Sequence, residues 1–395
     1  MSQKRPFIFL NLAHFLDHYF MLIFPTAVLA IHREWGRGYG DTLWLGTAAF
    51  VALGLSTLPA GWLGDRWRRS SMMVIFFIGL GLSGIAAGMA TGPVSLTAAL
   101  AAIGVFAGIY HPVAIAAVVR LAHGSGRAIA LNGVFGNMGF AGATIVTGLL
   151  TVEFGWRWAF IVPGVVSILL GLLAIRFMGQ EVDVTKAEAK SKPAFEVSSN
   201  VLLRVFLFVG VGAMFGGLIF NGITVAVPKL FDQQLHLADG DLLASGAFAA
   251  FAFAFAAFAQ LPTGRFLDRY GAKPVVLVIL TLQVPILVLV GQFFGLPLIA
   301  VTIVALLLVF GEIPVSDWLI GRHVSSAWQS RIFAVNYLFS LGVSALAVPL
   351  ISYLYNRSGD FQMLFWILGF CAALVLAAGI LLPNRRPAVA PQPAE

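Results

Sequence analysis

The feature that constrains this chain most is a series of twelve long apolar stretches separated by short polar connections. Each has about the 20 residues that a helix needs to cross a hydrocarbon core of about 30 Å. A membrane barrel would instead require alternating segments of about ten residues. The chain is therefore predicted to be an all-α membrane protein with transmembrane helices at residues 7–31, 43–63, 72–92, 94–119, 128–151, 158–178, 202–229, 242–263, 274–292, 297–320, 332–355 and 361–382.

The composition supports a surface that faces lipid. Apolar residues make up 59% of the chain and charged residues 10%, whereas a soluble domain carries about 25% charged residues. The net charge of +7 does not indicate a nucleic-acid partner, because the basic residues form short clusters between the apolar stretches. The single cysteine, Cys371, excludes an intrachain disulfide.

The distribution of basic residues predicts the orientation in the membrane. Loops rich in Lys and Arg stay in the cytoplasm, and with the N-terminus inside, few of the 24 basic residues fall outside: Arg33, Arg37, Arg157, Lys229 and Arg357. The first apolar stretch contains His14, Asp17 and His18, which a signal peptide would avoid, so we expect it to be an uncleaved helix. Both termini are expected in the cytoplasm of a bacterial-type cell, with the protein in its cytoplasmic (inner) membrane.

An internal repeat divides the chain into two related halves. Residues 58–66 align with residues 261–269 at an offset of 203, and residues 127–132 align with residues 331–336 after one inserted residue. We predict an N-terminal six-helix bundle at 1–178, a cytoplasmic linker at 179–200, a C-terminal six-helix bundle at 201–383 and a disordered cytoplasmic tail at 384–395. Parallel repeats of this kind are a transporter architecture, with the substrate site at the midplane between the halves.

Two loop motifs resemble the signature of the major facilitator superfamily. In the first half the motif contains Gly61, Asp65, Arg66 and Arg69, and in the second it contains Gly264, Asp268 and Arg269. The segment Gly155-Trp156-Arg157-Trp158 resembles that superfamily's turn between helices five and six. The resemblance implies the major facilitator fold. It also implies that the loop residues lock the cytoplasmic ends together in the outward-facing state, although they could instead only set topology.

Within the superfamily, a second group of residues resembles the fosmidomycin-resistance branch of exporters. These residues are His14 in helix one, Tyr110-His111-Pro112 in helix four and Gly136-Asn137-x-Gly139 in helix five. The chain departs from that branch by having Asp17-His18 where an Asn-Asp pair is usual, and Thr144 near the place of a helix-five proline. The branch resemblance implies export of a drug-like molecule.

Helix one carries three ionisable residues inside the predicted membrane span. Such residues cost about 2.5–3.5 kcal/mol each on insertion scales and are functional candidates by default. His14, Asp17 and His18 are spaced i, i+3 and i+4 and share one helix face. An acid beside an imidazole can exchange protons near neutral pH, which predicts a proton-coupling site. The alternative is a self-satisfied polar cluster that holds helix one against helix five or seven.

Four further polar residues are candidates for the same cavity: His111, Asn221, Glu312 and Asp317. Asn221 falls opposite His18 at the repeat offset, and His111 precedes Pro112, which frees a backbone carbonyl and kinks its helix. Glu312 is expected to face the cavity from helix ten. Asp317 could do the same or could pair with Arg322 or Arg120.

Three functions fit these patterns. The first is a proton-coupled antiporter for efflux of a small organic molecule, the second an uptake symporter or facilitator for a polar metabolite or anion, and the third a non-transporting assembly factor or sensor. The chain has no Walker-type loop, so we expect a proton gradient, not ATP, to drive it. We expect a monomer without enzymatic activity, cofactor or metal. The His14/His18 spacing is a weak metal signal.

Overall fold

The computed structural model describes residues 4–64, 66–121, 126–178, 199–235, 241–323 and 326–384, and these are helical apart from short connections. Twelve helices or helix pairs in this part of the chain are long and apolar enough to span a membrane, from Arg5–Glu34 to Gln362–Ile380. The predicted all-α class with twelve spans is confirmed. The predicted linker, except its last two residues, and the predicted tail, except Asn384, lie outside the described residues.

The first six spans contain eight α-helices and a short 3₁₀ turn. Their bounds are α1 Lys4–Glu34, α2 Tyr39–Leu43, η1 Trp44–Gly46, α3 Thr47–Gly64, α4 Arg69–Gly88, α5 Pro93–Ala107, α6 Tyr110–Leu121, α7 Gly126–Phe154 and α8 Trp156–Phe177. The fourth span is interrupted between α5 and α6, one turn before Pro112, because proline cannot donate a backbone hydrogen bond to the preceding turn.

The last six spans are interrupted more often. They comprise α9 Ser199–Val211, the π-helical turn η3 Gly212–Gly216, α10 Gly217–Gln234, α11 Leu242–Ala257, α12 Gln260–Tyr270, α13 Ala272–Val290, α14 Gly295–His323, α15 Ser326–Ser344, α16 Ala347–Ser358 and α17 Gln362–Ile380. The eleventh span is broken at Ala345 and Leu346, between α15 and α16. A break of this kind is tolerated at membrane depth where neighbouring helices surround it.

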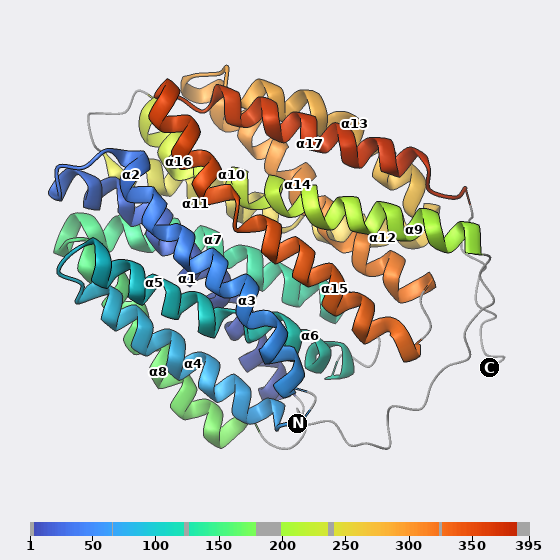
Figure 1. Ribbon diagram of the computed structural model, residues 1–395, viewed down its shortest axis with the longest axis horizontal. Coiled ribbons are helices and arrows are strands. Elements are labelled where there is room, and N and C mark those ends of the chain that lie inside the picture. The colour runs from blue at the N-terminus through green and yellow to red at the C-terminus, as the bar shows by residue number, and fades with distance from the viewer. Residues whose placement is uncertain are drawn as a thin grey trace.

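The two halves lie side by side, with α1–α8 on one side of the bundle and α9–α17 on the other (Figure 1). In the N-terminal half α1 packs on α7 and α4 on α8, and α7 packs on α11 across the halves. We call the end where α1 begins and α17 ends the terminal end. The opposite end, where α2 and α16 meet, is the far end.

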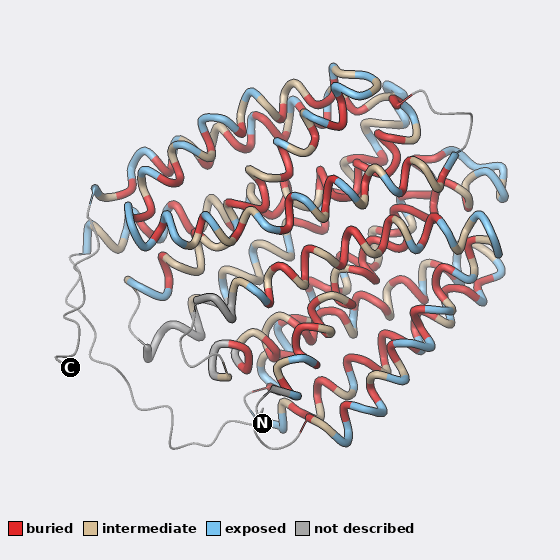
Figure 2. The backbone as a smooth tube through the Cα atoms, turned by 180° about the vertical axis from the view of Figure 1, so that it is seen from behind, coloured by how far each residue is buried: buried red, intermediate tan, exposed pale blue. Residues whose placement is uncertain are grey.

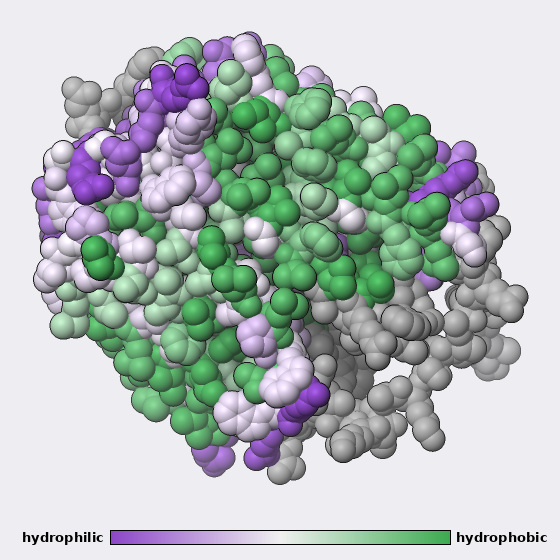
Figure 3. Space-filling view, viewed as in Figure 1, coloured by the Kyte–Doolittle hydropathy of each residue, from purple (hydrophilic) through white to green (hydrophobic). Residues whose placement is uncertain are grey.

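Apolar side chains cover the outside of the bundle at its middle. Exposed residues alternate with buried ones along the peripheral helices (Figure 2), and the outward side chains include Leu55 at 70% and Phe370 at 65% exposure. The surface in Figure 3 is hydrophobic across its centre and hydrophilic toward its ends. This pattern is the one a bilayer requires.

Glycines let several helices approach closely. A Cβ at Gly104 of α5 would collide with the backbone of Ala49 of α3, and a Cβ at Gly139 of α7 would collide with the backbone of Phe15 of α1. Small residues at such crossings are typical of packing inside membranes, where van der Waals contact replaces the hydrophobic effect.

Candidate functional site

Asp17 lies at the centre of the bundle, on the face of α1 that meets α6. Its side chain is 1% exposed, and its Oδ2 lies 3.2 Å from Nε2 of His111. The same oxygen is 3.9 Å from Nε2 of His18. Its Oδ1 is buried and meets no hydrogen-bond donor among the described residues. The predicted meeting of an acid and an imidazole therefore exists, but the closest partner comes from α6 instead of α1.

The interruption between α5 and α6 places His111 opposite Asp17. His111 is the second residue of α6, so its ring stands at the start of the helix, beside α1. Its Nδ1 is buried without a partner in the described structure. One ring nitrogen of His111 thus contacts a carboxylate, and the other has no hydrogen-bond partner among the described residues.

A cavity of about 50 Å³ lies between the halves beside this pair. It is lined by polar residues from both halves, Asp17, His18, His111, Asn221, Thr224 and Ser344, and by apolar ones, Met21, Leu22, Phe50, Leu53, Phe140, Phe220, Val225 and Leu341. Sites for drug-sized ligands have volumes of about 300–1,000 Å³. The halves must therefore move apart before such a ligand fits.

His14 is held by α7. Its Nδ1 lies 2.8 Å from the main-chain oxygen and 3.0 Å from Oδ1 of Asn132, and since both atoms are acceptors, Nδ1 donates. A Cβ at Gly136 would lie 2.5 Å from the other ring nitrogen, so glycine leaves room for the ring. His14 thus joins helix one to helix five, as the alternative interpretation of this cluster predicted.

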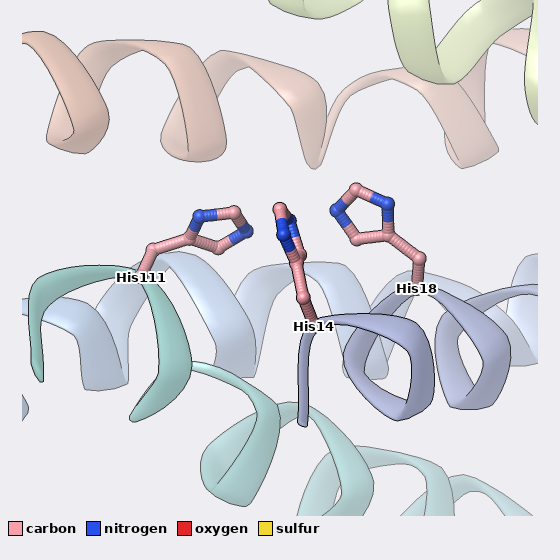
Figure 4. A group of neighbouring side chains, drawn as sticks. All are labelled: His14, His18 and His111. Atoms are coloured by element: carbon pink, nitrogen blue, oxygen red, sulfur yellow. The ribbon is translucent and has the colours of Figure 1, made fainter. Parts of the chain in front are cut away.

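Figure 4 shows the rings of His111 and His18 on either side of His14. One nitrogen from each ring can be chosen so that all three lie within 4.8 Å of one another. Nitrogens bound to one zinc ion at about 2.1 Å lie about 3.4 Å apart. The 4.8 Å limit is wider than this spacing, and we assign the rings no metal.

Asp317 approaches the same cluster from the C-terminal half. Its carboxylate accepts a hydrogen bond from the Tyr337 hydroxyl and interacts electrostatically with His111. The rings of Tyr337 and His111 are 5.7 Å apart. Asp317 was expected to face the cavity or to pair with an arginine. The structure brings it to Tyr337 and His111, so acids from both halves flank one histidine.

Glu312 lies elsewhere in the C-terminal half. Its Oε2 accepts a hydrogen bond of 3.2 Å from Nε2 of Gln283 on α13, and its Oε1 faces Gly216 in the π-helical turn. It is not among the residues that line the cavity beside Asp17. Asn221, in contrast, lines that cavity with His18, as its position in the repeat predicted.

The loop motifs make contacts within their own halves. The Arg66 guanidinium lies 4.1 Å from the Trp62 ring, Arg269 stacks on Tyr270, and Asp268 accepts a hydrogen bond of 3.0 Å from Trp318. Gly61 lies in α3 and Gly264 in α12, Arg69 begins α4, and Asp65 lies outside the described residues. The predicted gating role of these residues stays a prediction.

The sequence did not predict three further residues of this region: Asn132, Tyr337 and Gln283. Asn132 donates to Oδ1 of Asn11 at 2.9 Å and accepts from the Tyr110 hydroxyl at 3.1 Å. A signal for it existed, because Asn132 and Asn336 are equivalent in the internal repeat. Tyr337 and Gln283 carried no such signal, since neither is charged.

Comparison with known proteins decides the family. The model of the Major Facilitator Superfamily matches residues 9–311 and 241–395. The chain belongs to the major facilitator superfamily. A fold of this superfamily, with two related six-helix halves around a central site, is the one described above, and it is a transporter fold, not an enzyme fold.

Several curated members of the superfamily are similar to parts of the chain. The puromycin resistance protein pur8 of Streptomyces alboniger is 31% identical over 39% of this chain and 31% of its own length. The tetracenomycin C resistance and export protein of Streptomyces glaucescens is 28% identical over 45% of this chain and 33% of its own length. The chain thus spans about a third of the length of these two relatives.

A longer match is to a protein that is described as a transporter and not as a resistance protein. The probable 4-methylmuconolactone transporter of Cupriavidus pinatubonensis is 26% identical over 70% of this chain and 66% of its own length. Among solved structures, a bacterial homologue of the human lysosomal transporter Spinster, in an inward-facing and occupied conformation, has a TM-score of 0.68. It is 15% identical and covers 96% of this chain and 94% of its own, so it shows the fold.

Proposed function

We propose that this major facilitator protein is a proton-coupled exporter of small organic molecules. The observation that carries the proposal is the contact of 3.2 Å between Asp17 and His111 at a cavity between the two halves. An acid and an imidazole in contact titrate as a pair and can share one proton. A pair that faces water in one state and is closed off in the next can carry that proton across the membrane.

The groups around Asp17 support a proton carrier. His18 lies 3.9 Å from it on its own helix and His111 lies 3.2 Å from it on α6, and Tyr337 with Asp317 stand behind His111. The other helices around the cavity contribute side chains that do not titrate. These are Phe50 from α3, Phe140 from α7, and Phe220 and Asn221 from α10. We assign the coupled proton to the Asp17–His111 pair because its contact of 3.2 Å is shorter than the 3.9 Å between Asp17 and His18. Glu312 is the second candidate for proton coupling, and Asp317 is better placed to act through His111.

Alternating access would use the contacts at the far end. There Ser352 donates to the main-chain oxygen of Gly40 at 2.7 Å, and Asn356 donates to Asp41 at 2.8 Å. Arg33 and Asp232 form a third bridge between the halves, at 3.5 Å. Breaking these contacts would expose the cavity at the far end, while the loop motifs would close the terminal end. We place both termini in the cytoplasm of a bacterial inner membrane and expect a monomer.

Two relatives described as resistance proteins, one of them also as an export protein, favour efflux. The alternative is uptake of a polar metabolite, which the description of the 4-methylmuconolactone transporter favours. Proteoliposomes distinguish them, because substrate moves against the proton flux in an antiporter and with it in a symporter.

The test of proton coupling is Asp17→Asn, which keeps the shape of the side chain and removes its titration. A substrate is first identified by the rise in melting temperature of the purified protein against metabolites and antibiotics. We expect the variant to bind that substrate but to lose transport driven by a pH gradient, while exchange without a gradient continues. Full gradient-driven transport by Asp17→Asn would pass the role to Glu312, and normal transport by Glu312→Gln as well would leave facilitated diffusion.

A further inference from the structure

Asp17 presents one carboxylate oxygen that the described protein leaves unsatisfied. The side chain is 1% exposed and its Oδ2 faces His111, but Oδ1 has no donor. A buried carboxylate oxygen without a donor is costly. Because Asp17 also lines the central cavity, a bound ligand with a hydrogen-bond donor can satisfy that oxygen.

The charge of the surroundings selects the sign of such a ligand. Neither lysine nor arginine is among the residues that the structure places around the cavity. Throughout the described helices, these two residue types lie within about one and a half turns of a helix end, whereas Asp17, Glu312 and Asp317 lie deeper. An organic anion would meet the Asp17 carboxylate with no fixed positive charge to balance it.

The lining of the cavity is also aromatic. The rings of Phe140 and Phe220 both line it and lie 5.5 Å apart at an angle of 65°. Phe310 stands behind Phe220 at 5.4 Å. Aromatic faces attract cations and pack well against flat apolar groups. They give no comparable attraction to an anion.

We propose that the transported substrates are organic cations, in which a protonated amine donates to Oδ1 of Asp17 and an apolar or aromatic body packs on Phe140 and Phe220. This inference rests on the proposed function, since it takes the central cavity as the substrate site. It names the substrate class and separates this chain from carriers of organic anions.

The two oxygens of the carboxylate then have different partners. Oδ2 of Asp17 contacts Nε2 of His111 at 3.2 Å, with His18 as a further imidazole at 3.9 Å, whereas Oδ1 has no donor in the described protein. The ammonium group of the substrate can therefore bind to Oδ1 while the contact with His111 is kept.

The test compares three probes that share a naphthalene ring and differ in charge: 2-(1-naphthyl)ethylamine, 2-(1-naphthyl)ethanol and 1-naphthylacetate. Binding to the full chain in nanodiscs is measured by the fluorescence of the ring at one pH without a gradient, and binding to empty nanodiscs is subtracted. We expect the amine to bind about tenfold or more tighter than the alcohol, as a charge-assisted hydrogen bond provides, and the carboxylate to bind most weakly.

Variants separate the two parts of the site. Asp17→Asn should reduce the preference for the amine to less than about threefold, and Glu153→Gln, an exposed carboxylate at the end of α7, should leave it unchanged. Phe140→Leu should weaken all three probes while the order is kept. Equal binding of the three probes, tighter binding of the carboxylate, or no binding of the amine overturns the proposal. Because no proton gradient is present, such a result leaves the test of proton coupling unaffected.

Discussion

Asn132 joins three parts of the N-terminal half through one side chain. It is 2% exposed, and its amide contacts Asn11, Tyr110 and His14. We expect Asn132→Leu to leave these buried groups without partners, at about 1–3 kcal/mol each in water-soluble proteins and less in a membrane. The apparent melting temperature in detergent should fall by about 5 °C or more.

Asn137 provides the matched control on the same helix. It is 1% exposed, but its Nδ2 has no partner in the described structure. Asn137→Leu should therefore cost much less than Asn132→Leu. Equal losses for the two variants would show that Asn132 contributes only its volume.

At this scale the sequence predicted the charged residues of the site better than the neutral ones. Ionisable groups buried in an apolar span need partners, so they were expected to lie together. The structure brings together His14, Asp17, His18 and His111. Their pairing was not predictable. The partner of Asp17 depends on the break before Pro112, and the separation of Glu312 from the cavity depends on the rotation of α14, neither of which a spacing along the chain specifies.

At the scale of helices, the close contact between α3 and α5 predicts that a larger side chain at Gly104 destabilises the fold. A Cβ at Gly104 would collide with the backbone of Ala49, which cannot give way as a side chain can. Gly104→Ala should therefore lower the melting temperature and the yield of folded protein. Gly264→Ala is the control, because a Cβ there meets nothing within 4 Å. Stability of Gly104→Ala equal to that of the control would mean that α3 and α5 separate without cost.

The number and order of the spans were predictable because every apolar stretch must cross the bilayer. The interruptions inside five of the spans, at η1, between α5 and α6, at η3, between α11 and α12, and between α15 and α16, were not all predictable. Proline marks three of them, because Pro112, Pro262 and Pro349 are each the third residue of the helix after the break. The π-helical turn Gly212–Gly216 packs on α15 and α17 and contains no proline.

In the whole molecule, the far-end contacts hold the halves together on one side of the cavity. The double variant Asp41→Ala, Ser352→Ala removes two hydrogen bonds between the halves, each worth about 0.5–1.5 kcal/mol. We expect the population to shift by about tenfold toward a state that is open at the far end. Spin labels at Arg37→Cys and Ser358→Cys, in a Cys371→Ser background, should report a longer distance.

The matched control is the variant Ser83→Ala, labelled at the same two positions, Arg37→Cys and Ser358→Cys. Ser83→Ala removes a buried hydroxyl that is hydrogen-bonded within α4, and it leaves the far end intact. Its distance distribution should equal that of the parent. An unchanged distribution in the double variant would mean that the remaining bridge between Arg33 and Asp232, with the packing of Tyr39 on Tyr355 at 4.7 Å, is sufficient to keep the far end closed.

The unequal use of Asn132 and Asn336 bears on how this chain can evolve. The repeat assigns them to one ancestral position, yet Asn132 is fully engaged and Oδ1 of Asn336 is buried without a donor. Selection on the first copy is therefore tied to the stability of the N-terminal half. At Asn336 the side-chain oxygen has no donor to lose. Substitutions there should therefore accumulate with less loss of folded protein than substitutions at Asn132.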